Sequence, residues 1–189
     1  MKSAAILATV SAIASTASAQ YFGIMVSRSA SPIHFGQVNA NDREFWIGKD
    51  TASYCPLDSG CPAGNQTLFA ASGGSLSLAT VVPGGQQVYI DPTTGAVGFT
   101  QAHSGSMPDK AILKGWTYTP PAKDASFGYL TRPRGFLACS EKGDANEGPW
   151  QVFVDLKTVK HPAGECLGFS ALAVTGPEDG EQAGAWQYT

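Results

Sequence analysis

The side chains that could carry out chemistry are few and lie far apart along the chain. The three histidines, His34, His103 and His161, stand in separate segments. The stretch from His103 to Ser106 reads His-Ser-Gly-Ser, which does not match the G-x-S-x-G turn that exposes the nucleophile of a serine hydrolase. Gln20 follows the expected cleavage point of a leader, where a copper-binding histidine brace would need a histidine. Neither serine hydrolysis nor histidine-brace copper chemistry is supported.

Three carboxylates are the remaining candidates for acid–base chemistry. Glycoside hydrolases place two carboxyl groups on either side of the scissile bond, and Asp91, Asp155 and Glu165 are conceivable members of such a pair. Asp91 and Asp155 each follow an apolar run, where an aspartate ordinarily begins a turn. A secreted hydrolase or effector that uses these side chains on a wall or host polymer is therefore the alternative function, and the leading hypothesis below assigns no catalytic residue.

Aromatic side chains offer a binding chemistry instead of a catalytic one. The candidates for ligand contact are Trp46, Trp116 and Trp150, because a flat indole ring can stack on a ligand as well as fill a core. Residues 148–153 bear a faint likeness to the Q-x-W repeat of trefoil lectins. However, Trp150 precedes its glutamine and the pattern does not recur three times. Ligand contact and core packing both stay open for each tryptophan.

The four cysteines predict disulfides. Their number is even, and an exported chain matures in an oxidising environment. Three pairings are possible in principle. The short loop from Cys55 to Cys61 is bent by proline and glycine and favours a local bridge, which leaves Cys139 to pair with Cys166. Because neither C-x-x-C nor a Cys/His cluster appears in the sequence, disulfides are favoured over zinc, and no metal or cofactor is expected.

The N-terminus predicts export. Residues 1–19 read as a signal peptide, with Lys2 as the positive end, an apolar stretch over 4–13 and an A-x-A cleavage site at 17–19. Residues 20–189, 170 in number (189 − 19), are predicted to form a single domain. The apolar stretch is shorter than the roughly 20 residues that span a bilayer. No hydrophobic C-terminal tail encodes a lipid anchor, so no membrane anchor is expected.

The predicted surface is weakly charged and carries one glycosylation signal. Without Lys2 the net charge is 11 − 15 = −4, which argues against nucleic acid as a partner. Only 14% of residues are charged, against about 25% in an average protein. Low charge suits a neutral polymer. Asn65, in the sequon Asn-Gln-Thr, is the predicted N-glycosylation site.

Short strands must position these residues. No helical periodicity is sustained after the signal, whereas runs rich in β-branched and aromatic residues recur between turn-forming residues. The predicted strands are Tyr21 to Val26, Pro32 to Val38, Glu44 to Ile47, Thr67 to Ala70, Ser75 to Ala79, Gln87 to Ile90, Ala96 to Thr100, Trp116 to Thr119, Phe127 to Leu130, Phe136 to Cys139, Trp150 to Leu156 and Cys166 to Val174.

Two of these predictions are the sharpest. Trp150 to Leu156 alternates apolar and other residues with period two, so one face of that strand should point inward. Gln87 to Thr100 predicts a hairpin, because Pro92 and Gly95 suit the two backbone conformations of a turn. About twelve such strands predict an all-β, disulfide-stabilised domain. A β-trefoil-like barrel is ranked slightly ahead of a two-sheet β-sandwich.

Several stretches, taken in order, carry a family resemblance. They are Tyr21-Phe22-Gly23-Ile24, the segment around Cys55, Gly74 to Leu78, Gly115-Trp116, Phe136 to Cys139, Pro149 to Phe153, and Cys166 in its glycine-rich context. With these the chain resembles the PhiA family of fungal cell-wall proteins, which includes IgE-binding allergens.

The resemblance implies a small secreted glycoprotein of the fungal cell wall, associated with asexual development through phialides and conidia. It implies a structural role for Cys139 and Cys166, and it carries over no catalytic residue. The leading hypothesis is therefore a non-enzymatic, extracellular cell-wall protein whose β domain binds other wall components, with polysaccharide as the expected partner.

Overall fold

The computed structural model describes residues 20–161, 164–176 and 183–189, so the predicted signal peptide at 1–19 lies outside the described residues. The described parts contain strands and turns and no helix, which confirms the all-β class. The strands are β1 (Phe22–Ser27), β2 (Val38–Asn41), β3 (Glu44–Ile47), β4 (Ser53–Tyr54), β5 (Phe69–Ser72), β6 (Ser75–Leu78), β7 (Gln86–Ile90), β8 (Val97–Phe99), β9 (Thr117–Thr119), β10 (Gly128–Thr131), β11 (Phe136–Ser140), β12 (Trp150–Val154), β13 (Cys166–Thr175) and β14 (Gln187–Tyr188).

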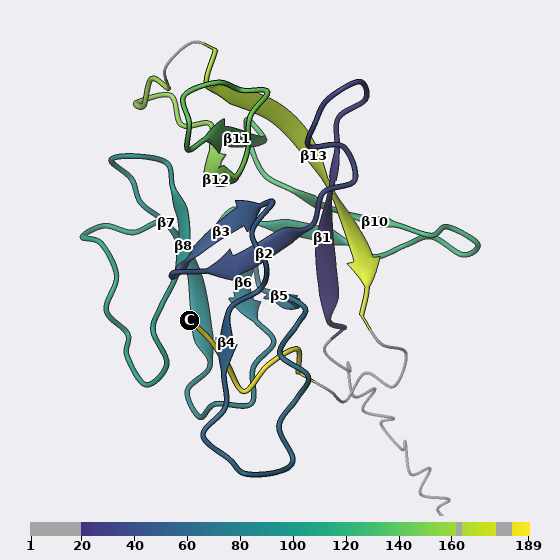
Figure 1. Ribbon diagram of the computed structural model, residues 1–189, viewed down its shortest axis with the longest axis vertical. Coiled ribbons are helices and arrows are strands. Elements are labelled where there is room, and N and C mark those ends of the chain that lie inside the picture. Colours follow the sequence, from purple (N-terminus) through teal and green to yellow (C-terminus); the bar gives the residue numbers. More distant parts are fainter. Residues whose placement is uncertain (1–19, 162–163, 177–182) are drawn as a thin grey trace, which may run out of the picture.

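Twelve of the strands form one antiparallel sheet. Their order is β1-β5-β6-β7-β8-β3-β12-β11-β13-β10-β9, with β2 paired to β3 beside this path. β1 pairs with β5 on one side and with the long strand β13 on the other. β1 and β13 lie side by side in Figure 1. β4 and β14 form a separate two-stranded sheet. The trefoil-like barrel and the sandwich stay predictions.

One predicted strand is wrong, and three strands of the structure, β2, β4 and β14, were not predicted. Residues 32–35 form turns instead of a strand, with Phe35 at φ 61°. The strand begins only at Val38, and β2 and β3 are joined by a tight turn in which Asp42 (φ 54°) and Arg43 (φ 60°) are both left-handed. Such turns are usually marked by glycine or Asn-Gly. Asp-Arg supplies no such mark, so the sequence did not show this hairpin.

The core is formed by the inward faces of the strands. In β12 the side chains of Trp150, Val152 and Val154 are buried and those between them are half-buried, which confirms the predicted alternation. β1 repeats this pattern with Phe22 and Val26, both fully buried. Burying one large apolar side chain contributes roughly 1.5–3 kcal/mol, so this one continuous cluster is the main source of stability.

The hairpin predicted at Gln87 to Thr100 is also present. β7 and β8 pair in antiparallel register, and the N–H of Gly95 donates to the carbonyl of Asp91 to close the turn. Gly95 has φ 79°, and a Cβ there would lie 2.7 Å from the carbonyl oxygen of Val154. The turn therefore packs directly against β12, and only glycine fits at this position.

A buried polar network fixes the C-terminal strand. The hydroxyl of Tyr188 donates to the carbonyl of Gln66 at 2.8 Å and accepts from the N–H of Leu68 at 3.0 Å. The amide of Gln86 accepts from the backbone N–H of Tyr188 and donates to its carbonyl oxygen. Burial raises the pKa of Tyr188 to about 12, although the hydrogen bond from Leu68 opposes this shift.

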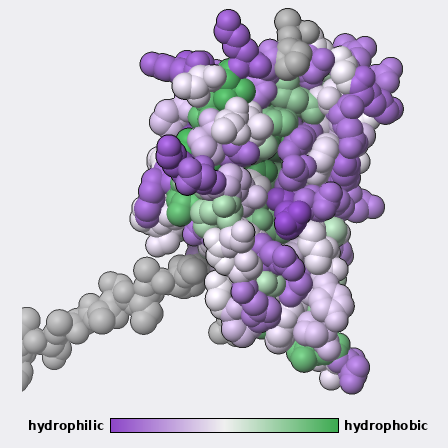
Figure 2. All heavy atoms as spheres, turned by 90° about the vertical axis from the view of Figure 1, so that its left-hand side faces the viewer, coloured by the Kyte–Doolittle hydropathy of each residue, from purple (hydrophilic) through white to green (hydrophobic). Residues whose placement is uncertain are grey.

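The described surface exposes few large apolar side chains. Figure 2 shows one face, on which pale and purple residues predominate and green residues appear in scattered places. The large hydrophobic residues exposed among the described ones come from four regions of the chain, two of which contribute a pair: Phe35, Tyr54 with Leu57, Val81, and Phe127 with Tyr129. No helix in the described segments is long and apolar enough to cross a membrane.

Candidate functional site

A row of side chains crosses the outer face of the sheet. The register pairs Trp46 with Gln151, Gln151 with Cys139, and Cys139 with Cys166. The neighbours of these residues along β3, β11 and β12 include members of the core cluster. Phe45 and Ile47, on either side of Trp46, are examples. Because successive side chains of a strand point to opposite faces, the row faces away from the core.

This row forms part of a groove of about 520 Å³, which we call the disulfide groove. The turn between β7 and β8, the start of the β11–β12 connection and the described ends of the β12–β13 connection also line it. Besides Cys139 and Cys166, its chemically important lining residues are Trp46, Glu141, Gln151, Phe153, His161 and Glu165. A concave site with aromatic rings and a few polar groups is the usual form of a small-ligand site.

Trp46 lines the groove but does not offer an open ring face. It is 6% exposed, and the Lys49 ammonium lies 3.2 Å from its ring centroid in a cation–π contact. Lys49 is also 3.4 Å from the Glu141 carboxylate, so one cation connects the ring with the groove wall. The Trp46 Nε1 is buried without a hydrogen-bond partner among the described residues. A ligand that stacks on Trp46 must displace Lys49.

The structure corrects the prediction of ligand contact for the other two tryptophans. Trp116 is 4% exposed and packs in the core beneath the Arg132 guanidinium, 5.0 Å from its ring centroid. Trp150 is 9% exposed and donates from Nε1 to the carbonyl of Ala145 at 2.9 Å. Both indole rings fill the core, where their large apolar area is removed from water, so neither is available for stacking.

The sulfur atoms of the groove lie beside a histidine that sequence reasoning did not connect with them. One nitrogen of His161 and the Sγ atoms of Cys139 and Cys166 all lie within 4.8 Å of one another. The His161 ring packs edge-on against Phe153, with 5.2 Å between ring centroids. The position of His161, five residues before Cys166, was the only local signal for this cluster.

The candidate carboxylates are not assembled as a pair in the groove. Asp91 accepts hydrogen bonds from the N–H and hydroxyl of Thr93, at 2.7 and 2.6 Å. Burial works against ionisation of Asp91, but hydrogen bonds from Thr93 and Thr94 outweigh it and lower its pKa. Asp155 accepts two hydrogen bonds from Arg134, at 3.0 and 2.9 Å. Of the three predicted carboxylates, only Glu165 lines the groove.

Glu44 is a further acidic residue beside the groove. It lies two positions before Trp46 in β3, on the same outer face. Burial raises the pKa of Glu44, and the negative charge of Asp42 raises it further, while a hydrogen bond with Gln151 works against both. Sequence reasoning did not select Glu44, because its burial depends on the neighbouring strands.

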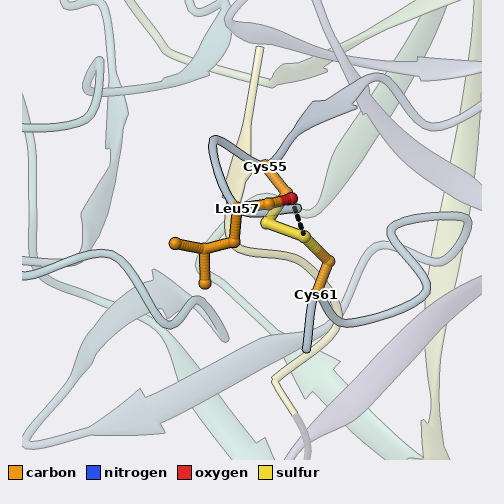
Figure 3. The surroundings of a disulfide bond; sticks show 3 residues. All are labelled: Cys55, Leu57 and Cys61. Atoms are coloured by element: carbon orange, nitrogen blue, oxygen red, sulfur yellow. Dashed lines mark hydrogen bonds between the residues drawn. A yellow bond between two sulfur atoms is a disulfide. The ribbon is translucent and has the colours of Figure 1, made fainter. Parts of the chain in front are cut away.

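The second bridge, Cys55–Cys61, lies in a different setting. The structure joins Cys55 to Cys61 and Cys139 to Cys166, the pairing expected from the sequence. Figure 3 shows the Cys55–Cys61 bridge beside Leu57 of its own loop, and Cys61 Sγ lies 3.4 Å from the carbonyl oxygen of Leu57. A bridged sulfur carries no proton, so this is a packing contact. None of the residues that line the disulfide groove belongs to the Cys55–Cys61 loop.

The predicted glycosylation site follows in the same connection between β4 and β5. Asn65 is exposed, whereas Thr67 of the sequon is buried and its hydroxyl accepts a hydrogen bond from the N–H of Ala40 at 2.8 Å. An exposed asparagine leaves room for a glycan in solvent. Glycosylation of Asn65 stays a prediction.

The comparisons with known proteins agree in one description. The family described as "PhiA-like secreted protein" matches residues 22–189. A curated protein of Arthroderma benhamiae, described as an uncharacterized secreted protein, is 35% identical over 159 residues, which cover 80% of this chain and 77% of the relative. No solved structure matches. The protein is a secreted fungal protein, and its chain belongs to the PhiA-like secreted protein family.

Proposed function

We propose that this protein is a non-enzymatic component of the fungal cell wall that binds neutral wall polysaccharide in the disulfide groove. The observation that carries the proposal is the groove itself. Its concave surface combines an aromatic ring, Phe153, with the hydrogen-bonding side chains of Gln151, Glu141 and Glu165. Sugars present hydroxyl groups and apolar ring faces, and this mixture of groups complements both.

The charges at the groove favour a neutral polymer. The carboxylates of Glu141 and Glu165 are balanced by the ammonium groups of Lys49 and Lys160. A polyanion would meet two carboxylates and a polycation two ammonium groups, so neither is preferred. A β-glucan or chitin chain, which carries no net charge, meets no such repulsion.

The settings of Asp91 and Asp155 support binding over hydrolysis. A retaining or inverting glycosidase holds two carboxyl groups across one scissile bond. Here Asp91 is used in a turn and Asp155 in an ion pair, and neither lines the groove. Membership of the PhiA-like secreted protein family supports an extracellular place, and the resemblance to fungal cell-wall proteins extends the proposal to the wall and to a role during asexual sporulation.

Retention on insoluble polysaccharide tests the proposal. The purified mature protein should bind β-glucan and chitin particles, and Gln151→Ala should weaken retention by about tenfold, the effect of losing one well-placed hydrogen bond to a ligand. Tyr129→Ala is the matched control, because Tyr129 is 52% exposed and does not line the groove. Equal retention of both variants, or no retention of the wild type at low and moderate salt, contradicts the proposal.

Glu165 provides the observation for the alternative, hydrolytic function. It is the one predicted carboxylate in the groove, so released sugars should be measured for the wild type and for Glu165→Gln, Asp91→Asn and Asp155→Asn. The proposal expects no sugar release from any of them. Release that is lost in a variant with an unchanged circular dichroism spectrum favours the enzyme.

A further inference from the structure

We propose that Cys139, Cys166 and His161 form a redox-controlled site for a zinc ion in the disulfide groove. While the bridge is closed the two sulfurs bind each other and no metal. When the bridge is reduced, the two thiolates and the imidazole become three ligands that face one point. The proposal goes beyond polysaccharide binding and does not depend on it.

The fold holds the three ligand atoms close enough to share one zinc ion once the sulfurs, bonded at 2.05 Å in the bridge, have separated. The three ligand atoms lie within 4.8 Å of one another. Tetrahedral zinc, with bonds of about 2.3 Å to sulfur and 2.0–2.1 Å to nitrogen, requires separations of roughly 3.5–3.8 Å between its ligand atoms. Side-chain rotation of the two cysteines from the bridged position covers this difference. No other group of three such side chains is this close within the described ranges.

The sheet keeps the two cysteines opposite each other after reduction. Cys139 and Cys166 are direct partners in the β11–β13 register, with 4.0 Å between their Cα atoms. The ladder continues through the next three pairs, up to Phe136 and Phe169, which pack together in the core. The backbone therefore does not rely on the bridge for this pairing, and the thiols cannot move far apart.

His161 is positioned and free to act as the third ligand. Its ring is held by the edge-on contact with Phe153, and its Nε2 is buried without a hydrogen-bond partner in the described part of the chain. A buried polar atom without a partner is costly, and a metal ion bound at Nε2 would remove that cost. Thiolate and imidazole ligands suit zinc, whereas calcium and magnesium prefer oxygen ligands. The fourth position faces the groove, where water can occupy it.

The chemical steps balance with an external dithiol as the reductant. Both cysteines line the groove and are half-buried, so a small dithiol can reach them. One of its sulfurs attacks the bridge and releases one cysteine, its second sulfur then attacks the first and releases the other cysteine, and the dithiol leaves as a cyclic disulfide. Its two electrons and two protons remain on Cys139 and Cys166 as thiols. The zinc ion then replaces those two protons.

Cobalt(II) titration tests the site, because cobalt replaces zinc and absorbs when bound by thiolate. The Cys55→Ser/Cys61→Ser variant is used as the parent, so that only one bridge can be reduced. The parent, reduced with a phosphine that does not chelate metal, should bind one equivalent with a thiolate absorption band. The oxidised parent should bind none. His161→Ala should weaken binding by about tenfold or more, the usual effect of losing part of a metal shell, whereas His103→Ala should not.

Three outcomes would overturn the proposal. They are equal cobalt binding by the oxidised and reduced parent, no binding by the reduced parent, and equal binding by His161→Ala and the parent. Near-ultraviolet circular dichroism shows whether reduction unfolds the chain. If it does, zinc should restore the folded spectrum of the reduced parent, because metal binding is coupled to folding. A reduced chain that stays unfolded in the presence of zinc also contradicts the site.

Discussion

The two disulfides of this protein perform different tasks. Cys139–Cys166 joins two central strands of the sheet, next to the groove, whereas Cys55–Cys61 closes a short exposed loop after β4. Figure 1 shows β11 and β12 toward one end of the long axis and β4 with its loop toward the other. One disulfide therefore supports the candidate site at one end of the molecule, and the other supports a surface loop at the opposite end.

Loop length gives a first estimate of what each bridge contributes to stability. The sequence separations are 27 for Cys139–Cys166 and 6 for Cys55–Cys61. In the chain-entropy model, loops of these lengths correspond to roughly 3.5 and 2 kcal/mol. The longer loop contains β12, a strand of the core, so its bridge should matter for the whole fold.

The largest expected effect is therefore that of Cys139→Ser/Cys166→Ser. Its free energy of unfolding should fall by about 3.5 kcal/mol, because the unfolded chain gains the freedom of the longer loop. Urea denaturation followed by tryptophan fluorescence measures the change. A loss below about 1 kcal/mol would show that the bridge constrains the unfolded chain far less than its loop length implies.

A smaller loss is expected for Cys55→Ser/Cys61→Ser, about 2 kcal/mol or less. The loop is exposed, and its release leaves the core cluster intact. The same denaturation experiment measures it. If this variant were the less stable of the two, the assignment of structural importance to the bridge beside the groove would be reversed.

A pair of glycines sharpens the comparison, because one lies near each bridge and both have φ 79°. Gly60→Ala should cost about 1 kcal/mol from the left-handed backbone alone, since no atom lies within 4 Å of the new Cβ. Gly95→Ala adds a clash at 2.7 Å with the carbonyl oxygen of Val154 and should cost about 2 kcal/mol or more. Thermal unfolding of the two variants gives the ranking, and equal losses would contradict the tight packing of the β7–β8 turn on β12.

The pH dependence of Tyr188 tests the end of the molecule that carries β4. The folded-state pKa of about 12 lies above the ordinary value of 10, so the protonated tyrosine is favoured by folding. The corresponding stability is fully present below pH 10 and is lost as the pH rises from 10 through about 12. Tyr188→Phe should lose about 1 kcal/mol at neutral pH, for its missing hydrogen bonds, and show less of this alkaline loss. Denaturation at pH 8 and pH 11 distinguishes the two proteins.

The elements with a regular pattern could be predicted from the sequence. Val152 and Val154 alternate with polar or outward residues, so the inward face of β12 was visible locally. The pattern of β3 was not informative, because Phe45, Trp46 and Ile47 are consecutive apolar residues. Which of them faces outward depends on a register that one residue of slippage would reverse, so the sequence could not tell that Trp46 differs from Trp150.

The amino-acid sequence by itself determined the all-β class, the export signal as a prediction, the turn at Pro92 and Gly95, and the preference of Cys55 for Cys61. Each of these depends on neighbouring residues or on composition. The tertiary structure alone decided the groove, because Trp46, Cys139, Gln151 and His161 come from separate segments and meet only through strand register. It also decided which groups the candidate carboxylates contact, since Arg134 reaches Asp155 only after β11 and β12 have paired.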